Sequence, residues 1–274
     1  MKVALLDGYN LMHRARFGMR QGDSYIIFNF FRSLRPIIEE LDPDLVYLVL
    51  EGMPTHRVQL DADYRANRVV IEGTPQAAEM AEFRKQKKLI LEALGNFPIT
   101  LAKHDELECD DTIASLCVDV HATDECTVVS TDTDFIQLLK AGGNVKLYNP
   151  VKKEYVEPVE HDYVIWKALR GDKTDNIPRV DGMTDGKALK IVNDPKRLDE
   201  VCKDPVLGPQ FDRNLTLVKF KTGDPQGIKV MRGNPDFSKA RSDFRDLKFF
   251  SMVNDTAWKN YTETFQRLLD KQEN

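Results

Sequence analysis

Apolar residues occur along the chain at two spacings, one typical of strands and one typical of helices. Short uninterrupted apolar runs predict four buried strands, at residues 2–6, 45–50, 127–130 and 144–148. Apolar positions return every three or four residues over 24–41, 84–94 and 108–120, which predicts helices, although Pro36 should kink or divide the first one. Strands that alternate with helices indicate an α/β domain with a mostly parallel sheet.

From about residue 158 the pattern becomes helical throughout. Apolar residues repeat at helical spacing in VIWKAL (164–169), in DGKALKIV (185–192) and in the aromatic-rich stretch 258–269. We therefore expect one domain over residues 1–158 and a smaller, mainly helical domain over residues 159–274. The spacing in 258–269 favours core packing over a docking helix for a partner protein.

Acidic residues follow three of the four predicted strands. Asp7 follows VALL, Glu51 follows LVYLVL, and Asp132 and Asp134 follow TVVST. In an open parallel sheet, binding sites form where the carboxyl ends of the strands meet. Taken alone, Asp132 and Asp134 can also be read as caps of the next helix, an interpretation that requires no chemistry.

Other acids are expected at the same edge of the sheet, from the start of the 108–120 helix and from GDKTDN. The complete set is Asp7, Glu51, Glu108, Asp110, Asp111, Asp132, Asp134, Asp172 and Asp175. These carboxylates could not all ionise without a compensating charge. A site rich in carboxylates and free of Cys and His favours Mg²⁺ or Mn²⁺. An EF-hand calcium loop is excluded by Ile136 and Gln137, and an aspartyl phosphatase by the lack of a second Asp just after Asp7.

Composition and charge change this picture in one respect. The 274-residue chain is 42% hydrophobic and 30% charged, and its net charge of −5 by itself argues against a phosphate-bearing partner. With the nine acids set aside, 35 acidic residues remain against 39 basic ones, so the rest of the chain is mildly basic. No apolar run is long enough for a signal peptide or a membrane span, and the four cysteines lack metal-binding spacing. We expect a cytoplasmic protein with reduced thiols.

Five motifs occur in the order found in the 5′-nuclease superfamily, and the chain resembles that family over residues 3–192. The motifs are LLDGYNLMHRARF, DADYRANR, ELECDDTIASL, STDTDFIQLL and GDKTDNIPRVDG. The family includes flap endonucleases, phage 5′–3′ exonucleases and the 5′-nuclease domain of bacterial DNA polymerase I. The resemblance implies a PIN-like α/β core, a helical arch near 64–94 and a helix–hairpin–helix-like segment at 170–192. Without a polymerase domain, the chain looks more like a phage enzyme or a stand-alone bacterial enzyme than like a polymerase fragment. A phage enzyme would act in the host cytoplasm.

The resemblance also implies a role for each acid. The first of two Mg²⁺ or Mn²⁺ ions would be held by Asp7, Glu51, Glu108 and Asp110. The second would be held by Asp132, Asp134 and Asp175, with Asp111 and Asp172 as outer or water-mediated ligands. Such ions activate water and clamp the scissile phosphate in phosphodiester hydrolysis. Glu51 departs from the family, which generally has Asp at that position.

Basic and aromatic residues match the region that holds a single-stranded 5′ end in this family. Around the arch they are Tyr64, Arg65, Arg68, Arg84, Lys85, Lys87 and Lys88. The tyrosine ring would stack a splayed base, and Arg65, Arg84 and Arg14 would act on the scissile phosphate. A solvated helix face explains residues 84–88 equally well, and a surface arginine explains Arg14 nearly as well. Arg65 stands where Lys is usual.

The segment at residues 179–190, RVDGMTDGKALK, resembles the helix–hairpin–helix segment that binds duplex phosphates in this family. Lys187 and Lys190 would be its phosphate contacts, and the family often binds one K⁺ there. Thr184 replaces an expected glycine and the glycine–lysine step falls one residue late, so the segment departs from the family pattern.

We expect a metal-dependent, structure-specific 5′ nuclease with 5′–3′ exonuclease and flap endonuclease activity, which removes primers in replication. Its substrates would be DNA with a 5′ flap and RNA–DNA hybrids. A single-stranded-DNA-binding protein or a clamp would be a candidate partner of the monomer. Two alternatives remain: a PIN-type ribonuclease, which GDKTDNIP and the long C-terminal region disfavour, and a non-catalytic binder of branched DNA with a structural divalent cation.

Overall fold

The protein is described by a computed structural model that covers residues 1–20, 22–139 and 143–273. Its centre is a seven-stranded sheet in the order β6-β5-β4-β1-β2-β3-β7. The strands are β1 (Lys2–Asp7), β2 (Leu45–Leu50), β3 (Thr100–His104), β4 (Glu125–Val129), β5 (Val145–Asn149), β6 (Glu154–Tyr155) and β7 (Ile228–Arg232). Strands β1 to β5 are parallel, whereas β6 and β7 pair antiparallel at the two edges. The expected mostly parallel α/β fold is confirmed.

The described part of the chain also contains twelve α-helices. They are α1 (Gly8–Ala15), α2 (Tyr25–Leu41), α3 (Thr55–Leu60), α4 (Pro75–Leu94), α5 (Cys109–Ser115), α6 (Tyr163–Arg170), α7 (Asp185–Val192), α8 (Pro195–Lys203), α9 (Leu207–Val218), α10 (Phe237–Asp246), α11 (Phe250–Val253) and α12 (Asp255–Glu273). Shorter helical turns follow α5 (η2, Leu116–Val120), precede β5 (η3, Thr133–Leu138), and lie at Ala66–Arg68 (η1) and Pro225–Gly227 (η4). None of the described helices is both long and apolar enough to cross a membrane.

The sheet is apolar on both faces because successive side chains of a strand point to opposite sides. On β1, Ala4 and Leu6 join a core with α1, α2, α4 and α10–α12, whereas Val3 and Leu5 join a second core that includes α5. A third, smaller core lies within α6–α9. Burial on both faces explains why the parallel strands read as continuous apolar runs.

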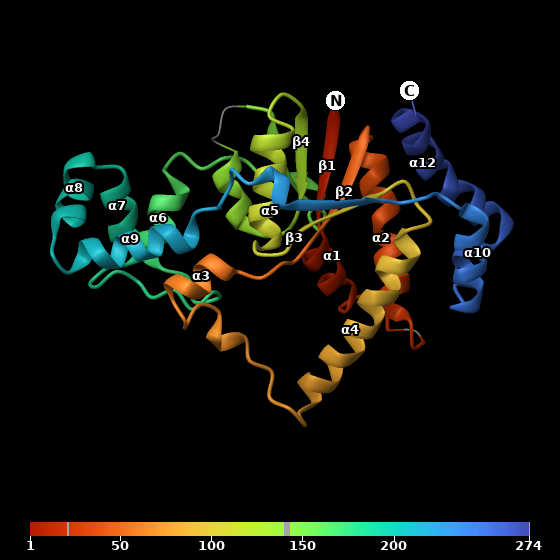
Figure 1. Ribbon diagram of the computed structural model, residues 1–274, viewed down its shortest axis with the longest axis horizontal. Helices are drawn as coiled ribbons and strands as arrows, with labels where there is room; N and C mark the ends of the chain where they lie inside the picture. Colours follow the sequence, from red (N-terminus) through yellow and green to blue (C-terminus); the bar gives the residue numbers. More distant parts are fainter. Residues whose placement is uncertain (21, 140–142, 274) are drawn as a thin grey trace.

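The C-terminal region differs from the expected helical domain over 159–274. Helices α6–α9 gather at one end of the molecule, but the chain then returns along the sheet as β7, paired with β3, and ends in α10–α12 beside α2 (Figure 1). Trp258, Tyr261 and Phe265 are buried in the same core as α2, as their spacing predicted. Residues 228–268 therefore complete the first domain, and only α6–α9 form a separate helical unit.

One local expectation was wrong in part, and one predicted helix extends beyond its expected bounds. Pro36 does not divide the first long helix, because α2 runs unbroken from Tyr25 to Leu41 with Pro36 on its exposed side. There the missing N–H of Pro36 costs the helix one intrahelical hydrogen bond. The helix expected at 84–94 is longer: it begins at Pro75, capped by the Thr74 side chain, which accepts a bond from Ala77 N.

Candidate functional site

The carboxyl ends of β4, β1 and β2 lie side by side and carry the first group of acids. Asp7 ends β1 and caps α1, accepting bonds from Asn10 N at 3.0 Å and from Ser130 Oγ at 2.7 Å. Asp132 follows β4 and accepts from the Asp134 N–H at 2.9 Å as the cap of η3. The cap interpretation of Asp132 is therefore confirmed, but Asp132 also lies near enough to Asp7 for its charge to raise the pKa of Asp7.

Asp110, in the first turn of α5, completes this first group. Burial raises the pKa of Asp110 well above its usual range, and the charges of Asp7 and Asp132 raise it further. Burial likewise raises the pKa of Asp7 to about 6, and burial followed by the charge of Asp134 raises that of Asp132. Among the residues that the structure describes, none forms an ion pair with Asp7, Asp110 or Asp132. We call these three residues the unpaired triad.

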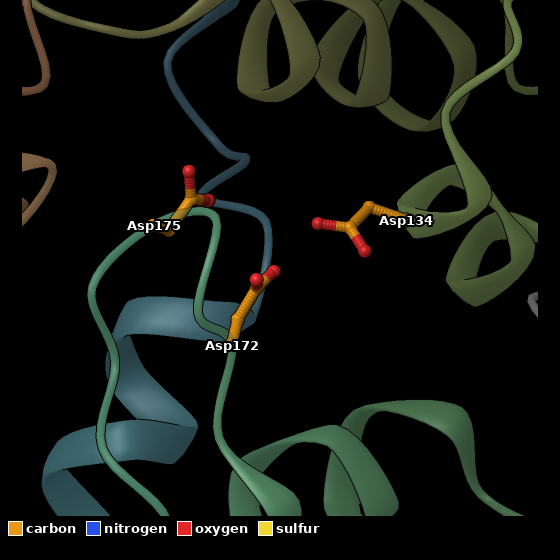
Figure 2. Close-up of side chains that lie close together, drawn as sticks. All are labelled: Asp134, Asp172 and Asp175. Atoms are coloured by element: carbon orange, nitrogen blue, oxygen red, sulfur yellow. The ribbon is translucent and has the colours of Figure 1, made fainter. Parts of the chain in front are cut away.

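A second group of acids lines a cavity of about 220 Å³ together with Asp110 and Asp132 of the unpaired triad. Oxygen atoms of Asp134, Asp172 and Asp175 all lie within 4.8 Å of one another. Asp134 belongs to η3 and points toward the loop after α6 that carries Asp172 and Asp175 (Figure 2). The loop is held by a bridge between Asp172 and Ile177 and by the Thr174 N–H, which donates to Asp172 at 2.7 Å. We call these three acids the second group.

Positively charged side chains contact every member of the second group. Lys167 of α6 contacts Asp134 and lies 2.7 Å from Asp172. Arg65 and Arg68 reach Asp175 at 2.9 and 2.5 Å. Arg65 adopts a left-handed backbone conformation with φ 56°, which lets its own N–H donate to the Asp175 carbonyl at 2.9 Å. The two groups of acids thus differ: the protein neutralises the second and leaves the first without a cation.

Glu108 lies between the site and the core. Arg57 donates to it at 2.7 Å, the Tyr64 hydroxyl donates at 2.9 Å, and Arg65 also contacts it. Burial raises the pKa of Glu108, and the charges of Arg65 and Arg57 partly offset that effect. Glu51 is more open: its carboxylate accepts from Cys109 N at 3.2 Å and pairs with Arg65 at 3.3 Å.

Three residues predicted for the site do not line the acidic cavity. Asp111 is fully buried on the inner side of α5, where its two carboxylate oxygens accept bonds from Arg57 and from Lys221 N. Arg14 is exposed two turns along α1 and lines a different hollow, between α1, α2 and the β5–β6 connection. Tyr64 is only 6% exposed and packs against Ile177, so its ring is not available to stack a base.

Arg57 and Lys167 are the site residues that the sequence reasoning missed. A faint signal existed for Lys167, which stands among apolar residues in VIWKALR, so a helix that buries its neighbours also buries the lysine stem. Arg57 lies seven residues after β2, in a segment without apolar periodicity. It donates hydrogen bonds to the carbonyls of Leu217 and Lys219, some 160 residues later in the chain. No local pattern predicts such a contact.

Of the expected nucleic-acid residues, Arg68 lines the acidic cavity and the others lie outside it. The segment from residue 61 runs away from the sheet and α4 brings it back, which forms an arch (Figure 1). Arg84, Lys85 and Lys88 are exposed on α4, whereas Lys87 lies over the Tyr9 ring at 5.7 Å. The residues that follow α6 form a loop and then α7, whose exposed Lys187 and Lys190 were expected to contact phosphates.

Thr184 caps α7 by accepting from Lys187 N at 3.2 Å. The Lys187 ammonium donates to the Gly182 carbonyl at 3.2 Å. The departure of Thr184 from the family pattern is therefore compatible with a well-capped helix. The K⁺ ion expected in this loop stays a prediction.

Comparisons with known proteins agree with this fold. The family described as "5'-3' exonuclease, N-terminal resolvase-like domain" matches residues 2–168. DNA polymerase I of Chloroflexus aurantiacus is 27% identical over 286 residues, which cover 90% of this chain and 29% of that protein. The 5'-3' exonuclease of Bacillus subtilis is 28% identical over 233 residues, covering 76% of this chain and 75% of the relative. The chain spans about a third or less of the length of the DNA polymerase I relatives.

Solved structures show the same fold at low sequence identity. The T5 D15 protein co-crystallised with metal ions superposes with a TM-score of 0.65 at 18% identity, covering 96% of this chain and 99% of that one. Flap endonuclease-1 from Methanococcus jannaschii gives a TM-score of 0.60 at 16% identity, covering 99% and 92%. The family match over more than half of the chain is decisive: this chain belongs to the 5′–3′ exonuclease family of the 5′-nuclease superfamily.

Proposed function

We propose that this chain is a metal-dependent, structure-specific nuclease that hydrolyses phosphodiesters at 5′ flaps and 5′ ends of DNA, and at RNA primers in RNA–DNA hybrids, with two divalent ions. One observation carries the proposal. Three carboxylates with raised pKa values, those of the unpaired triad, converge at the end of a parallel sheet without a protein cation. Buried charges of one sign need a partner, and an all-oxygen donor set suits Mg²⁺ or Mn²⁺.

The residues present fit such ions in two places. Asp7, Asp110 and Asp132, with Glu51 beside them, would hold the first ion. Asp134, Asp172 and Asp175 would hold the second, once their own cations move. Bound there, divalent ions supply an activated water and neutralise charge on the scissile phosphate. The T5 protein with this fold was co-crystallised with metal ions, which supports the same use of this site.

The basic side chains around the cavity would bind and orient the substrate. Arg65, Arg68 and Lys167 line the cavity together with the acids, so a phosphate that enters it meets donors as well as carboxylates. Arg84, Lys85 and Lys88 on the arch helix would hold the phosphates of the single-stranded end, and Lys187 and Lys190 those of the duplex. These contacts fix the register of the DNA, and the acidic cavity then determines which phosphodiester is cut.

The biological role that we propose is primer removal during replication. It is supported by the relatives that are DNA polymerase I, whose own name connects them to DNA synthesis. Crystal structures with the same fold include a T5 flap endonuclease in complex with DNA and metal ions, which supports DNA as the substrate. A single-stranded-DNA-binding protein or a clamp as a partner, and a monomeric state, stay predictions.

The test is cleavage of four labelled substrates, each with Mg²⁺ and with EDTA: a 5′ flap, a blunt duplex, an RNA–DNA hybrid and single-stranded RNA. We expect cutting near the flap junction and at 5′ ends of the duplex and hybrid, with Mg²⁺ only. Cleavage of single-stranded RNA alone would identify a PIN-type ribonuclease instead. Tight, metal-dependent flap binding without any cleavage would identify a non-catalytic binder of branched DNA.

A further inference from the structure

Lys167 occupies the second group of acids from within the protein. Its side chain is 9% exposed, and its ammonium contacts Asp134 and lies 2.7 Å from Asp172. The Tyr163 hydroxyl also donates to Asp134, at 2.9 Å. The ammonium is therefore held by two carboxylates in the place where the proposed function puts the second ion.

Lys167 is buried among the acids of the site, and its ammonium forms ion pairs with both Asp134 and Asp172. A lysine buried with two carboxylates is stable only because the attraction offsets the cost of removing it from water. A divalent ion on the same oxygen atoms would meet a positive charge at contact distance, so the ion and the ammonium exclude one another.

The unpaired triad and the second group differ in whether the protein supplies a cation. Within the described part of the chain, no cation pairs with Asp7, Asp110 or Asp132, whereas Lys167, Arg65 and Arg68 pair with all three members of the second group. A divalent ion would thus meet carboxylates alone at the unpaired triad, but a bound ammonium at the second group. This inference rests on the proposed function, since it concerns the same two ion sites.

We propose that Lys167 is a displaceable internal counter-ion, which must leave the second group before a divalent ion binds there. A DNA phosphate is the alternative partner for its ammonium, because Lys167 lines the cavity that the scissile phosphate would enter. The phosphate and the second ion then assist each other's binding, as linked equilibria require. The protein completes its ion set only when substrate is present.

A purely structural role for Lys167 makes a different prediction. In that case the lysine only ties α6 to η3 and to the loop that carries Asp172, and its removal would lower stability without creating a stronger ion site. The number and affinity of bound ions therefore separate the two roles, and stability alone does not.

The experiment counts Mn²⁺ ions bound to the DNA-free protein, from the electron paramagnetic resonance signal of free Mn²⁺ at increasing concentrations. Wild type, Lys167→Met, Lys167→Gln and the control Lys173→Met are compared, and urea unfolding verifies that each is folded. Lys173 is exposed in the neighbouring loop and forms no ion pair with the residues that the structure describes. We expect one tight ion in wild type and in the control, and a second ion in both Lys167 variants with affinity raised about tenfold or more.

Two equally tight ions in wild type would overturn the proposal without recourse to any variant. A single ion of unchanged affinity in both Lys167 variants would overturn it as well and would leave the structural role. The proposed function fails in a distinguishable way, because it predicts at least one tight ion: absence of bound Mn²⁺ from every protein contradicts the metal site itself.

Discussion

Arg57 and Glu108 form a buried ion pair, with Arg57 Nη1 2.7 Å from Glu108 Oε2 and both side chains 3% exposed. The same guanidinium contacts both carboxylate oxygens of Asp111 and donates to the carbonyls of Leu217 and Lys219. Arg57 thereby joins three parts of the chain: the segment after β2, helix α5 that carries Asp110, and the end of α9. Through Glu108 and Asp111, the Arg57 side chain fixes the start of α5 from the side that faces the core.

Replacing Arg57 with Met should therefore destabilise the protein strongly. The change leaves Glu108 and Asp111 buried without a cation, and breaking a buried pair in this way costs about 3–5 kcal/mol. Urea unfolding measures the difference. The matched control is Arg35→Met, which removes a surface pair with Glu39 at 3.0 Å and should cost about 0.5 kcal/mol or less. Equal losses in the two variants would contradict the central position of Arg57.

Tyr64→Phe should lower the free energy of unfolding by about 1 kcal/mol, because the variant loses a buried hydroxyl donor and leaves Glu108 with one bond fewer. The control Tyr155→Phe changes a ring that is 47% exposed and should have no measurable effect. Thermal or urea unfolding decides the matter. If Tyr64→Phe is as stable as wild type, the tyrosine is not held by Glu108 as the structure has it.

The stability of the metal-free protein should depend on pH through Asp7. Its folded pKa of about 6 exceeds the ordinary value of 3.8, so the folded state binds a proton more tightly than the unfolded state does. Stability contributed by this group is then greatest at low pH and is lost as the pH rises toward and through 6. At neutral pH the cost is on the order of 2–3 kcal/mol.

The measurement is the difference in unfolding free energy between wild type and Asp7→Asn, in EDTA, from pH 7.5 to pH 4.5. Taking the difference cancels the titration of the histidines, which is common to both proteins. Wild type should gain stability relative to the variant as the pH falls. Mg²⁺ should reverse the trend, because the ion binds the ionised carboxylates and stabilises most at high pH. If the difference in unfolding free energy between the two proteins does not change with pH, the raised pKa of Asp7 in the folded state is contradicted.

The exposed cations on α4 should bind DNA without supporting the fold. The double variant Arg84→Ala, Lys85→Ala should weaken binding of a 5′ flap and lower the slope of log K against log salt by about 1–2. The control combines Lys259→Ala with Arg267→Ala on α12, which lies at the end of the molecule opposite α6–α9 (Figure 1). Binding is followed by fluorescence anisotropy at several salt concentrations. Equal effects from both double variants would indicate general charge attraction instead of an arch contact.

Much of this architecture could be predicted from the sequence, because strands with both faces buried are continuous apolar runs. The acids that follow these runs mark where the strands end. Strand β3 was missed because TLAKH is short and carries a lysine and a histidine, and β7 because IKVMR is an edge strand with only partial burial. Both depend on pairing with distant residues, such as Ala102 with Val230, which local patterns do not report.

The site was predicted less completely than the fold. Seven of the nine acids could be found because they follow a strand or begin a helix, whereas Asp172 and Asp175 lie in the loop after α6 and were found from GDKTDN. The directions of Asp110 and Asp111, adjacent on α5, could not be separated until the partner of each was known: Asp110 faces the cavity and Asp111 faces Arg57. Lys167 was missed for the same reason: its partners could not be known from local sequence. Asp134 is distant along the chain, and Asp172 lies beyond the turn that ends α6.

The most direct test of the account is the single-turnover rate of flap cleavage in Mg²⁺, measured for wild type, Asp110→Asn and the control Asp246→Asn, with flap binding measured in parallel. Asp110 belongs to the unpaired triad, and Asp246 is an exposed acid at the end of α10. We expect Asp110→Asn to bind the flap as wild type does and to cut it about 100-fold more slowly or worse, because the substitution removes a charged oxygen ligand of the ion that activates water. Equal rates for all three proteins, or binding without cleavage by wild type, would contradict a metal-dependent nuclease at this site.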